Sequence, residues 1–418
     1  MSTAKGIIVS MYQILIVAYD CNPTRGSEAM FAFNWVNILS KYYKVTLITD
    51  IRHKKGLESS IHGIDLLCCK YMPERLSDIL CKLHAHNIQY SLFIKKVKKI
   101  IDKNNADKFD LIHCLTPSGH YSCNDLYIYG KPIIAGPLGG GLKLPEGFEN
   151  YKTLKYILRN NYYSRIRKNE KWNRYYNNCD LILIGTKYLL ENLPEAIHYK
   201  TVELFDTVVD TDKFAPCSEK SLETVNIVYS GRLELSKGCM LLIKAYKLLL
   251  MEGYAQSRLI MLGDGSQYGK ICKFIREEKL ENYIYMPGRV TNSTVREILQ
   301  AADIFCLPTL IEHGGTSILE AMSCELPVVT TNYGGPSISV TAECGIKIDA
   351  VNNNQYILSL KEALKYLIDN PEERRRMGRN GRIRVIAEYS YSSLEEKVVL
   401  LYENTFKKLD KCKLYNII

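Results

Sequence analysis

The chain has 418 residues, of which 46% are apolar and 24% are charged, and its formal net charge is +10. Because a single hydrophobic core does not grow to this length, two or three domains are expected. The composition is that of an ordinary globular protein and excludes a disordered or collagen-like chain, and no apolar stretch approaches the roughly 20 residues needed to span a bilayer.

The first half predicts a series of buried strands. Residues 1–10 precede a second methionine, Met11, and are interpreted as a dispensable extension. The apolar run behind them lacks a small-residue cleavage site, so a strand is favoured over a signal peptide. A helix is predicted at 26–43, and apolar runs rich in β-branched residues predict strands at 13–19, 44–49, 64–69, 109–115, 132–136, 180–185 and 201–205.

The second half repeats this pattern. Helices are predicted at 237–253, 292–302 and 316–324, between strands at 225–231, 257–263, 282–288, 302–308 and 326–331. Repeated β-α-β units with continuous apolar strands indicate α/β domains whose parallel sheets are covered on both faces. We therefore expect two Rossmann-like domains, at 1–205 and 206–390, with a linker within 206–224 and a terminal helix at 391–418 that packs back toward the first domain.

The fourteen cysteines are scattered and none are spaced as C-x-x-C, which favours reduced thiols in a cytosolic protein over a disulfide scaffold. The histidines also lack the spacing of a zinc site, so no metal site is predicted.

The positive charge is unevenly divided. Residues 1–200 hold 28 Lys and Arg against 17 Asp and Glu, whereas residues 201–418 hold 27 against 28. The excess concentrates at 93–103 and 159–176. Either cluster is equally well explained as a solvated helix face, but the asymmetry as a whole favours an anionic partner such as a membrane surface, a lipid-linked phosphate or nucleic acid.

Three glycine-containing turns follow predicted strands, where ligands of open α/β sheets bind. They lie at Gly26, at 135–141 and at 231–238. None has the G-x-G-x-x-G or G-x-x-x-x-G-K-[ST] spacing, which argues against a dinucleotide oxidoreductase and a P-loop ATPase. The third turn, GRLELSKG, places Arg232 and Lys237 in one loop, where two cations suit a diphosphate; a surface salt-bridged turn is the alternative.

The stretch IEHGGTSILEAMSCELPVV (311–329) carries two acids around a glycine turn. Gly314 and Gly315 are expected to open a helix whose first backbone N–H groups form an anion site. Glu320 lies about one turn inside that helix and Glu312 outside it, so the acids flank the anion site. A nucleotide sugar has this layout of sugar hydroxyls on both sides of a diphosphate. Glu320 as a charge that stabilises the helix terminus is the alternative.

At these residues the sequence resembles the retaining GT-B glycosyltransferases of the family 4 type. Residues 225–340 carry the similarity, in GRLELSKG, MLGDG (261–265), PGRV, ADIFCLPT, EHGGTSILEAMSCELPVV and NYGG. The first half resembles a subgroup of this family through RGSEAMFAFNWV and AGPLGGGLKLP. The resemblance implies two Rossmann-like domains whose parallel sheets face across a deep cleft.

The resemblance also implies transfer of a sugar from a nucleotide diphosphate sugar, UDP- or GDP-linked, with retention of configuration and with no metal or other cofactor. Arg232 and Lys237 would hold the diphosphate, Glu320 the ribose, and Glu312 would face the donor sugar. The remaining donor-binding positions would be Gly26, Gly263, Arg289, Val290, Gly314, Gly315, Thr316 and Ser317. The catalytic set would be Glu312, Arg232, Lys237 and His120, although a packed or solvent-facing role for His120 stays open.

Four features depart from the family pattern. Glu325 and Thr207 replace glycines, Ile338 stands where an acid is common, and His313-Gly314 stands in place of the commonest GF pair. The first three bear on the identity of the sugar and base and leave the reaction class intact.

The expected mechanism is front-face displacement, in which the departing diphosphate accepts the acceptor's proton. The basic first half suggests a saccharide acceptor on a lipid-linked diphosphate, as in capsule, O-antigen or exopolysaccharide biosynthesis. The protein would then be cytoplasmic, with peripheral contact at the inner face of an anionic membrane. The alternatives are a sugar-nucleotide epimerase of the same fold, a non-catalytic nucleotide or glycan binder, and a nucleic-acid binder; the last would not explain the segment around Glu312 and Glu320.

Overall fold

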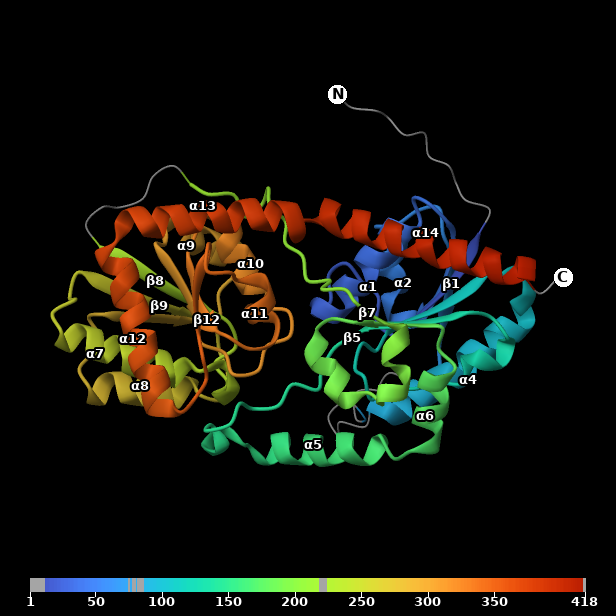
Figure 1. Ribbon diagram of the computed structural model, residues 1–418, viewed down its shortest axis with the longest axis horizontal. Helices are drawn as coiled ribbons and strands as arrows, with labels where there is room; N and C mark the ends of the chain where they lie inside the picture. The colour runs from blue at the N-terminus through green and yellow to red at the C-terminus, as the bar shows by residue number, and fades with distance from the viewer. Residues whose placement is uncertain (1–11, 74–75, 77–79, 81–85, 218–223, 416–418) are drawn as a thin grey trace, which may run out of the picture. The chain divides into compact units, whose positions relative to one another are not determined.

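The computed structural model describes residues 12–415 apart from 74–75, 77–79, 81–85 and 218–223 (Figure 1). The interpretation of residues 1–10 as an extension lies outside the described residues, as does part of the expected linker at 206–224. The described cysteines are all free.

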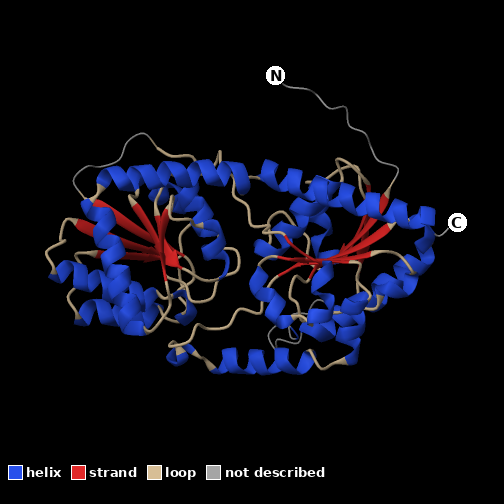
Figure 2. Cartoon of the chain, in the orientation of Figure 1, coloured by secondary structure: helices blue, strands red, loops and turns tan. Residues whose placement is uncertain are grey.

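The chain divides into two compact units. The first comprises residues 1–141, 158–206 and 395–418, and the second comprises 142–157 and 207–394. The sequence-based boundary at 205/206 lies one residue from the observed division, but the transfer of residues 142–157 to the second unit was not foreseen. Within each unit the strands lie between helices (Figure 2), and the expected α/β class with two parallel sheets is confirmed.

The first unit contains a parallel sheet in the order β3-β2-β1-β4-β5-β6-β7. The order reverses direction between β1 and β4, which makes that edge of the sheet a topological switch point. The strands are β1 (Gln13–Ala18), β2 (Lys44–Asp50), β3 (Asp65–Cys69), β4 (Leu111–Thr116), β5 (Ile133–Leu138), β6 (Leu181–Ile184) and β7 (Thr201–Glu203). The helices include α1 (Gly26–Leu39), α2 (Lys54–Glu58), α4 (His86–Asn104) and α6 (Glu170–Asn177). Helix α5 (Leu154–Ile166) belongs to the first unit from residue 158 onward, and its first four residues belong to the second.

The core of the first unit forms because its strands are apolar on both faces. Leu15 and Val17 of β1, Phe93 of α4 and Trp172 of α6 are fully buried in one cluster. A continuous apolar strand has no face suited to water, so helices must cover both sides of the sheet.

Helix α14 (Tyr391–Tyr415) ends the described chain, and from residue 395 onward it belongs to the first unit. Phe406 stacks on Tyr12 with ring centroids 4.0 Å apart. Tyr402 is fully buried, and its hydroxyl lies 2.6 Å from Nδ1 of His113 in β4. The C-terminal segment therefore forms part of the core around the beginning of the chain.

The second unit contains a parallel sheet in the order β10-β9-β8-β11-β12-β13, with its switch point between β8 and β11. Its last strand, β13, was not predicted from the sequence. The strands are β8 (Val225–Ser230), β9 (Ser257–Leu262), β10 (Ile284–Gly288), β11 (Ile304–Leu307), β12 (Val328–Thr331) and β13 (Gly345–Ile348). The helices include α7 (Cys239–Met251), α8 (Tyr268–Glu277), α9 (Asn292–Ala301), α10 (Thr316–Ser323), α11 (Gly334–Ser339), α12 (Asn353–Asp369) and α13 (Pro371–Glu388).

Residues 142–157 join the second unit because apolar side chains anchor them there. Phe148 is fully buried, with its ring edge-on to that of buried Tyr356 at 5.8 Å between centroids. The backbone N–H of Lys143 donates to the hydroxyl of Tyr333 at 3.3 Å. This aromatic pair and this hydrogen bond both join the segment to residues of the second unit, and the aromatic pair contributes more than the area that it buries.

Candidate functional site

The loops after β8 and β11 meet at the switch point of the second sheet. Arg232 and Lys237 lie in the loop after β8, and Glu312 lies in the loop after β11. Because β8 and β11 are neighbouring parallel strands, their carboxyl ends lie at the same edge. The fold therefore brings together three charged residues that are up to 80 positions apart in the sequence.

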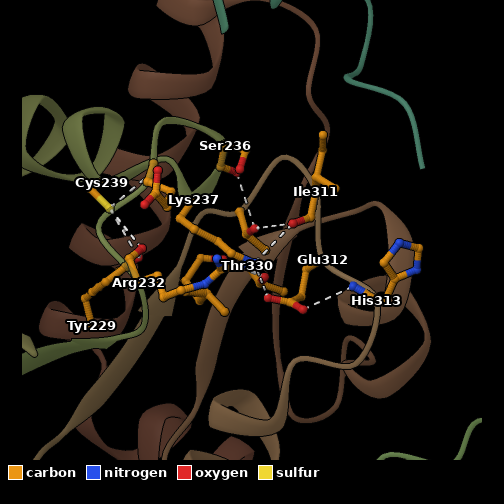
Figure 3. A network of polar contacts seen from close by, with 12 residues as sticks. Tyr229, Arg232, Ser236, Lys237, Cys239, Ile311, Glu312, His313 and Thr330 are labelled. Atoms are coloured by element: carbon orange, nitrogen blue, oxygen red, sulfur yellow. Dashed lines mark hydrogen bonds and ion pairs between the residues drawn. The ribbon is translucent and has the colours of Figure 1, made fainter. Parts of the chain in front are cut away.

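Lys237 and Glu312 form the central contact of this edge (Figure 3). Nζ of Lys237 donates to Oε2 of Glu312 at 2.5 Å and to the carbonyl oxygen of Ile311 at 3.2 Å. The other carboxylate oxygen, Oε1, accepts from the backbone N–H of His313 at 3.1 Å. The side chains of Lys237 and Glu312 are only 12% and 21% exposed, so the pair is shielded from most solvent screening.

The pair keeps Glu312 ionised. Burial by itself raises the pKa of this carboxyl, but the charge and hydrogen bond of Lys237, the Gly315 backbone N–H and the charge of His313 outweigh burial, so that the pKa lies below its ordinary value. A carboxylate next to an ammonium group supplies both an acceptor for hydroxyls and a cation for phosphate oxygens.

Arg232 completes the charged part of the loop after β8. Its side chain is exposed, while its carbonyl oxygen accepts from the hydroxyl of Tyr229 at 2.9 Å. Tyr229 is fully buried in β8, so this bond ties the loop to the strand. The backbone at Arg232 is thereby held while its guanidinium faces solvent.

Helix α10 begins beside Glu312. Its N-cap residue, Gly315, has φ +69° and ψ +43° and no side chain that could cap the first turn. Thr316 is exposed and Ser317 half-buried. The first N–H groups of this helix are thus not capped by a side chain, and the helix dipole adds positive potential at the same point.

Glu320 lies in the same helix in a different environment. Burial raises its pKa to about 7, although the charge of Lys213 acts in the opposite direction. Ionisation of this carboxyl is therefore costly in the structure as it stands. The two acids singled out by the sequence therefore differ in their pKa, which lies below the ordinary value for Glu312 and above it for Glu320.

Two of the departures from the family pattern have structural counterparts. Glu325 adopts φ +60°, the left-handed conformation that glycine tolerates best. Thr207 lies against Gly314, and a Cβ atom added to Gly314 would lie 2.5 Å from Oγ1 of Thr207. The smaller residue at 314 gives room to the larger one at 207.

The other predicted donor-binding residues of the second unit follow neighbouring strands. Gly263 comes directly after β9 with φ +138°, and a Cβ atom there would lie 1.9 Å from the carbonyl oxygen of Gly231. Arg289 and Val290 come directly after β10; Arg289 is exposed and Val290 half-buried. All three thus lie at the same sheet edge as the Lys237–Glu312 pair.

Gly26 and His120 lie in the first unit, after the two strands of its switch point. Gly26 begins α1 with φ +69°. His120 is fully buried, and its ring lies edge-on to that of Tyr163 at 4.8 Å. Glu28, in the first turn of α1, joins this helix to the loop after β4, because its Oε1 accepts from the backbone N–H and the hydroxyl of Ser118 at 2.6 and 2.9 Å. His120 Nδ1 also lies 3.3 Å from the carbonyl oxygen of Gly139, and its part in binding or catalysis remains a prediction.

A polar cluster in the first unit was missed by sequence reasoning. His53 Nε2 lies 3.0 Å from Asp20 Oδ1, and Arg52 lies 3.0 Å from Asp50 Oδ2. Asp50 ends β2, Arg52 and His53 follow it, and Asp20 comes shortly after β1. Charged residues at the end of a buried apolar strand, as in the sequence LITDIRH, were the available signal.

Across the described part of the chain, no three His, Cys, Asp or Glu side chains gather as a metal-binding group. Independence from metal remains a prediction. Within the same described ranges, every helix falls short of the length and apolarity that crossing a bilayer requires.

Comparison with known proteins finds a family model that matches most of the second unit. Residues 210–384 match the family model described as glycosyl transferases group 1. The chain is 25% identical over 244 residues to the GDP-mannose-dependent monoacylated alpha-(1-6)-phosphatidylinositol monomannoside mannosyltransferase of Corynebacterium glutamicum. That match covers 54% of this chain and 62% of the relative.

Solved structures match most of the chain at the level of fold. Sucrose-phosphate synthase from Thermosynechococcus elongatus is 16% identical with a TM-score of 0.66, and the match covers 95% of this chain and 100% of that one. Anabaena HepE, solved in complex with UDP-glucose, is 15% identical with a TM-score of 0.61, covering 94% and 99%. The GT-B fold, with its two Rossmann-like domains, is thus shared with known glycosyltransferases.

Proposed function

We propose that this chain, whose residues 210–384 match the glycosyl transferases group 1 model, is a retaining glycosyltransferase that uses a nucleotide diphosphate sugar. The observation that carries the proposal is the Lys237–Glu312 pair beside the uncapped first turn of α10, at the switch point of the second sheet. A site that offers cations, helix N–H groups and a carboxylate within one loop cluster suits a sugar joined to a diphosphate.

The diphosphate would be held by Arg232, Lys237 and the N–H groups of residues 315–317. In the free protein Lys237 is paired with Glu312, so part of its charge is already balanced, whereas the Arg232 guanidinium faces solvent. The charge of Arg232 would therefore be neutralised by the bound diphosphate to a larger extent than that of Lys237. As the bond between sugar and diphosphate breaks, these groups would balance the charge that develops on the leaving phosphate.

The two acids would hold the sugars on either side. Glu312, ionised by its neighbours, would accept hydroxyl hydrogen bonds from the donor sugar. Glu320 would receive the ribose hydroxyls, whose donated hydrogen bonds would lower its raised pKa and favour its ionised form. Gly263, Arg289 and Val290 would lie near the diphosphate and the base, and Gly26 and His120 of the first unit would complete the donor and acceptor contacts.

The reaction would proceed on one face of the sugar. The acceptor oxygen forms a bond to the anomeric carbon as the bond to the diphosphate oxygen breaks, and the acceptor's proton passes to the departing diphosphate. No metal or other cofactor is needed in this scheme, since the cations of the protein balance the leaving group.

The acceptor is proposed to be a saccharide on a lipid-linked diphosphate, in the assembly of a surface polysaccharide at the cytoplasmic face of a membrane. The uneven charge, with 28 cations and 17 acids in residues 1–200, supports an anionic acceptor. A relative named as acting on a phosphatidylinositol monomannoside is consistent with a lipid-borne acceptor.

A donor hydrolysis assay tests the proposal. The full chain is incubated with UDP-glucose, GDP-mannose and ADP-glucose without acceptor, and released nucleotide and sugar are followed by proton NMR. We expect hydrolysis of one donor, with the α-anomer of an α-linked donor released first and with activity unchanged by EDTA. Arg232→Gln should lower the rate about 100-fold, since it removes one charge from the phosphate contacts, while Arg276→Gln, a matched loss of an exposed arginine on α8, should have no effect.

The products of this assay distinguish a glycosyltransferase from the alternative functions. An epimerised sugar nucleotide would identify an epimerase, and binding without turnover would identify a non-catalytic binder. Release of the inverted anomer would contradict the retaining mechanism while leaving the transferase class in place.

A further inference from the structure

Helix α5 exposes an apolar stripe. None of its residues is buried, and Leu154, Ile157, Leu158 and Tyr162 are 72%, 43%, 59% and 37% exposed. Their spacing of three, four and eight positions from Leu154 places them on one face of the helix. Four large apolar side chains in one row are more than the scattered exposure that is normal on a protein surface.

The opposite face of α5 is fixed by tyrosines. The hydroxyl of Tyr156 accepts from the backbone N–H of Leu144 at 2.9 Å. Seven positions further on, Tyr163 stacks on Tyr121 with ring centroids 5.2 Å apart. Tyr162, at the end of the stripe, also contacts the chain, because Asn87 donates to its hydroxyl and its ring lies edge-on to that of Tyr121 at 6.3 Å. Tyr156 and Tyr163 hold the opposite face, so Leu154, Ile157 and Leu158 form the part of the stripe that is left exposed.

The segment around the stripe is rich in positive charge. Residues 152–169 contain six cations and no Asp or Glu: Lys152, Lys155, Arg159, Arg165, Arg167 and Lys168. The charged ends of such side chains can reach outward while their apolar stems extend the stripe. Another soluble protein would need a matching acidic and apolar surface, whereas an anionic bilayer supplies both properties at once.

We propose that the leucine face of α5 lies in the headgroup region of an anionic membrane. This inference rests on the proposed function, because a lipid-linked acceptor would require the enzyme at the membrane surface. The apolar stripe enters the boundary between headgroups and acyl chains, and exposed cations beside it, among them Lys152 and Lys155, contact lipid phosphates. A nucleic acid would supply phosphates for the cations but no apolar surface for the leucines, so it would account for the charge and not for the apolar stripe.

Vesicle co-sedimentation of the full chain tests the inference. Vesicles of 30% phosphatidylglycerol in phosphatidylcholine should bind the protein, and pure phosphatidylcholine should bind it much less. Each cation near an anionic surface contributes about fivefold in partitioning, so Lys152→Glu with Lys155→Glu should weaken binding at least 25-fold. Lys270→Glu with Lys273→Glu, on α8, makes the same change of charge at the same spacing away from any such stripe and should have little effect.

The apolar part is tested at constant charge. Leu154→Gln with Leu158→Gln should weaken binding at least tenfold, since each buried methylene contributes about fourfold. Leu358→Gln with Leu400→Gln replaces two isolated exposed leucines and should bind like the parent. Because all these side chains are exposed, circular dichroism should show unchanged folding.

Several results would overturn the assignment. One is a failure of the parent protein to bind the anionic vesicles, and another is binding of the glutamine variants at the level of the parent. A change from dimer to monomer in the glutamine variants would show that α5 is a contact between two copies of the chain. Donor hydrolysis in solution distinguishes the two proposals: the α5 variants should keep it, so its absence from the parent would count against the proposed function and not against the membrane surface.

Discussion

Replacing Lys237 by methionine tests the electrostatics of the candidate site. Methionine keeps the apolar stem but leaves Glu312 without the ammonium group at 2.5 Å. Removing one partner of a buried ion pair costs about 3–5 kcal/mol, and the residual 21% exposure of Glu312 places the expected loss of unfolding free energy at about 3 kcal/mol at pH 7.

The pH dependence should change sign in this variant. In the parent the pKa of Glu312 is lowered, so its contribution to stability is present above the ordinary value of 4.5 and is lost as pH falls through the lower folded value. Without Lys237, burial dominates and raises the pKa above 4.5. The folded variant then takes up a proton more readily than the unfolded chain, and the destabilisation should shrink from about 3 kcal/mol at pH 7 to about 1 kcal/mol at pH 5.

The positions of the tryptophans allow the measurement to be assigned to one unit. Trp35 and Trp172, the only tryptophans of the chain, both lie in the first unit. In urea unfolding, far-UV circular dichroism should therefore show an earlier transition for Lys237→Met, while tryptophan fluorescence should change less. The double variant with Glu312→Gln should lose the pH dependence. Equal stability of parent and Lys237→Met, or a difference that grows toward pH 5, would refute the reasoning.

Other predictions follow from single residues. Glu320→Gln should stabilise the protein by about 1–3 kcal/mol at pH 8 and by little at pH 4.5, because the cost of ionising a carboxyl with a pKa of about 7 appears only as pH rises from 4.5. Thermal melts at both pH values check this. The affinity of the variant for nucleotide should fall. Gly263→Ala should lower the free energy of unfolding by about 2–4 kcal/mol, since its Cβ atom would lie 1.9 Å from the Gly231 carbonyl oxygen. Gly269→Ala, with open space around the new Cβ atom, should leave this free energy unchanged or raise it by up to about 1 kcal/mol. Urea unfolding measures both. Glu325→Gly should stabilise by about 0.5–1 kcal/mol because it relieves the cost of φ +60°, and a melting temperature no higher than that of the parent would contradict this.

The amino-acid sequence alone determined the class of fold. Parallel strands buried on both faces are written as continuous apolar runs, and each of the twelve strands expected from these runs is present in one of the two sheets. Strand β13 was missed because Gly345–Ile348 is short and only partly buried, and so lacks a continuous apolar run. Arg232, Lys237 and Glu312 could be singled out because a charged residue directly after a buried strand lies at a sheet edge, whichever strands become neighbours.

Tertiary structure decided which of these residues meet and what their surroundings do to them. The pairing of Lys237 with Glu312 depends on β8 and β11 being neighbours, a property of strand order that no local pattern carries. The opposite pKa shifts of Glu312 and Glu320 depend on burial and on Lys237, which differ although both acids flank one helix terminus. The assignment of residues 142–157 to the second unit likewise follows from the contact of Phe148 with Tyr356, since packing energy arises between residues distant in the chain and leaves little trace in either segment alone.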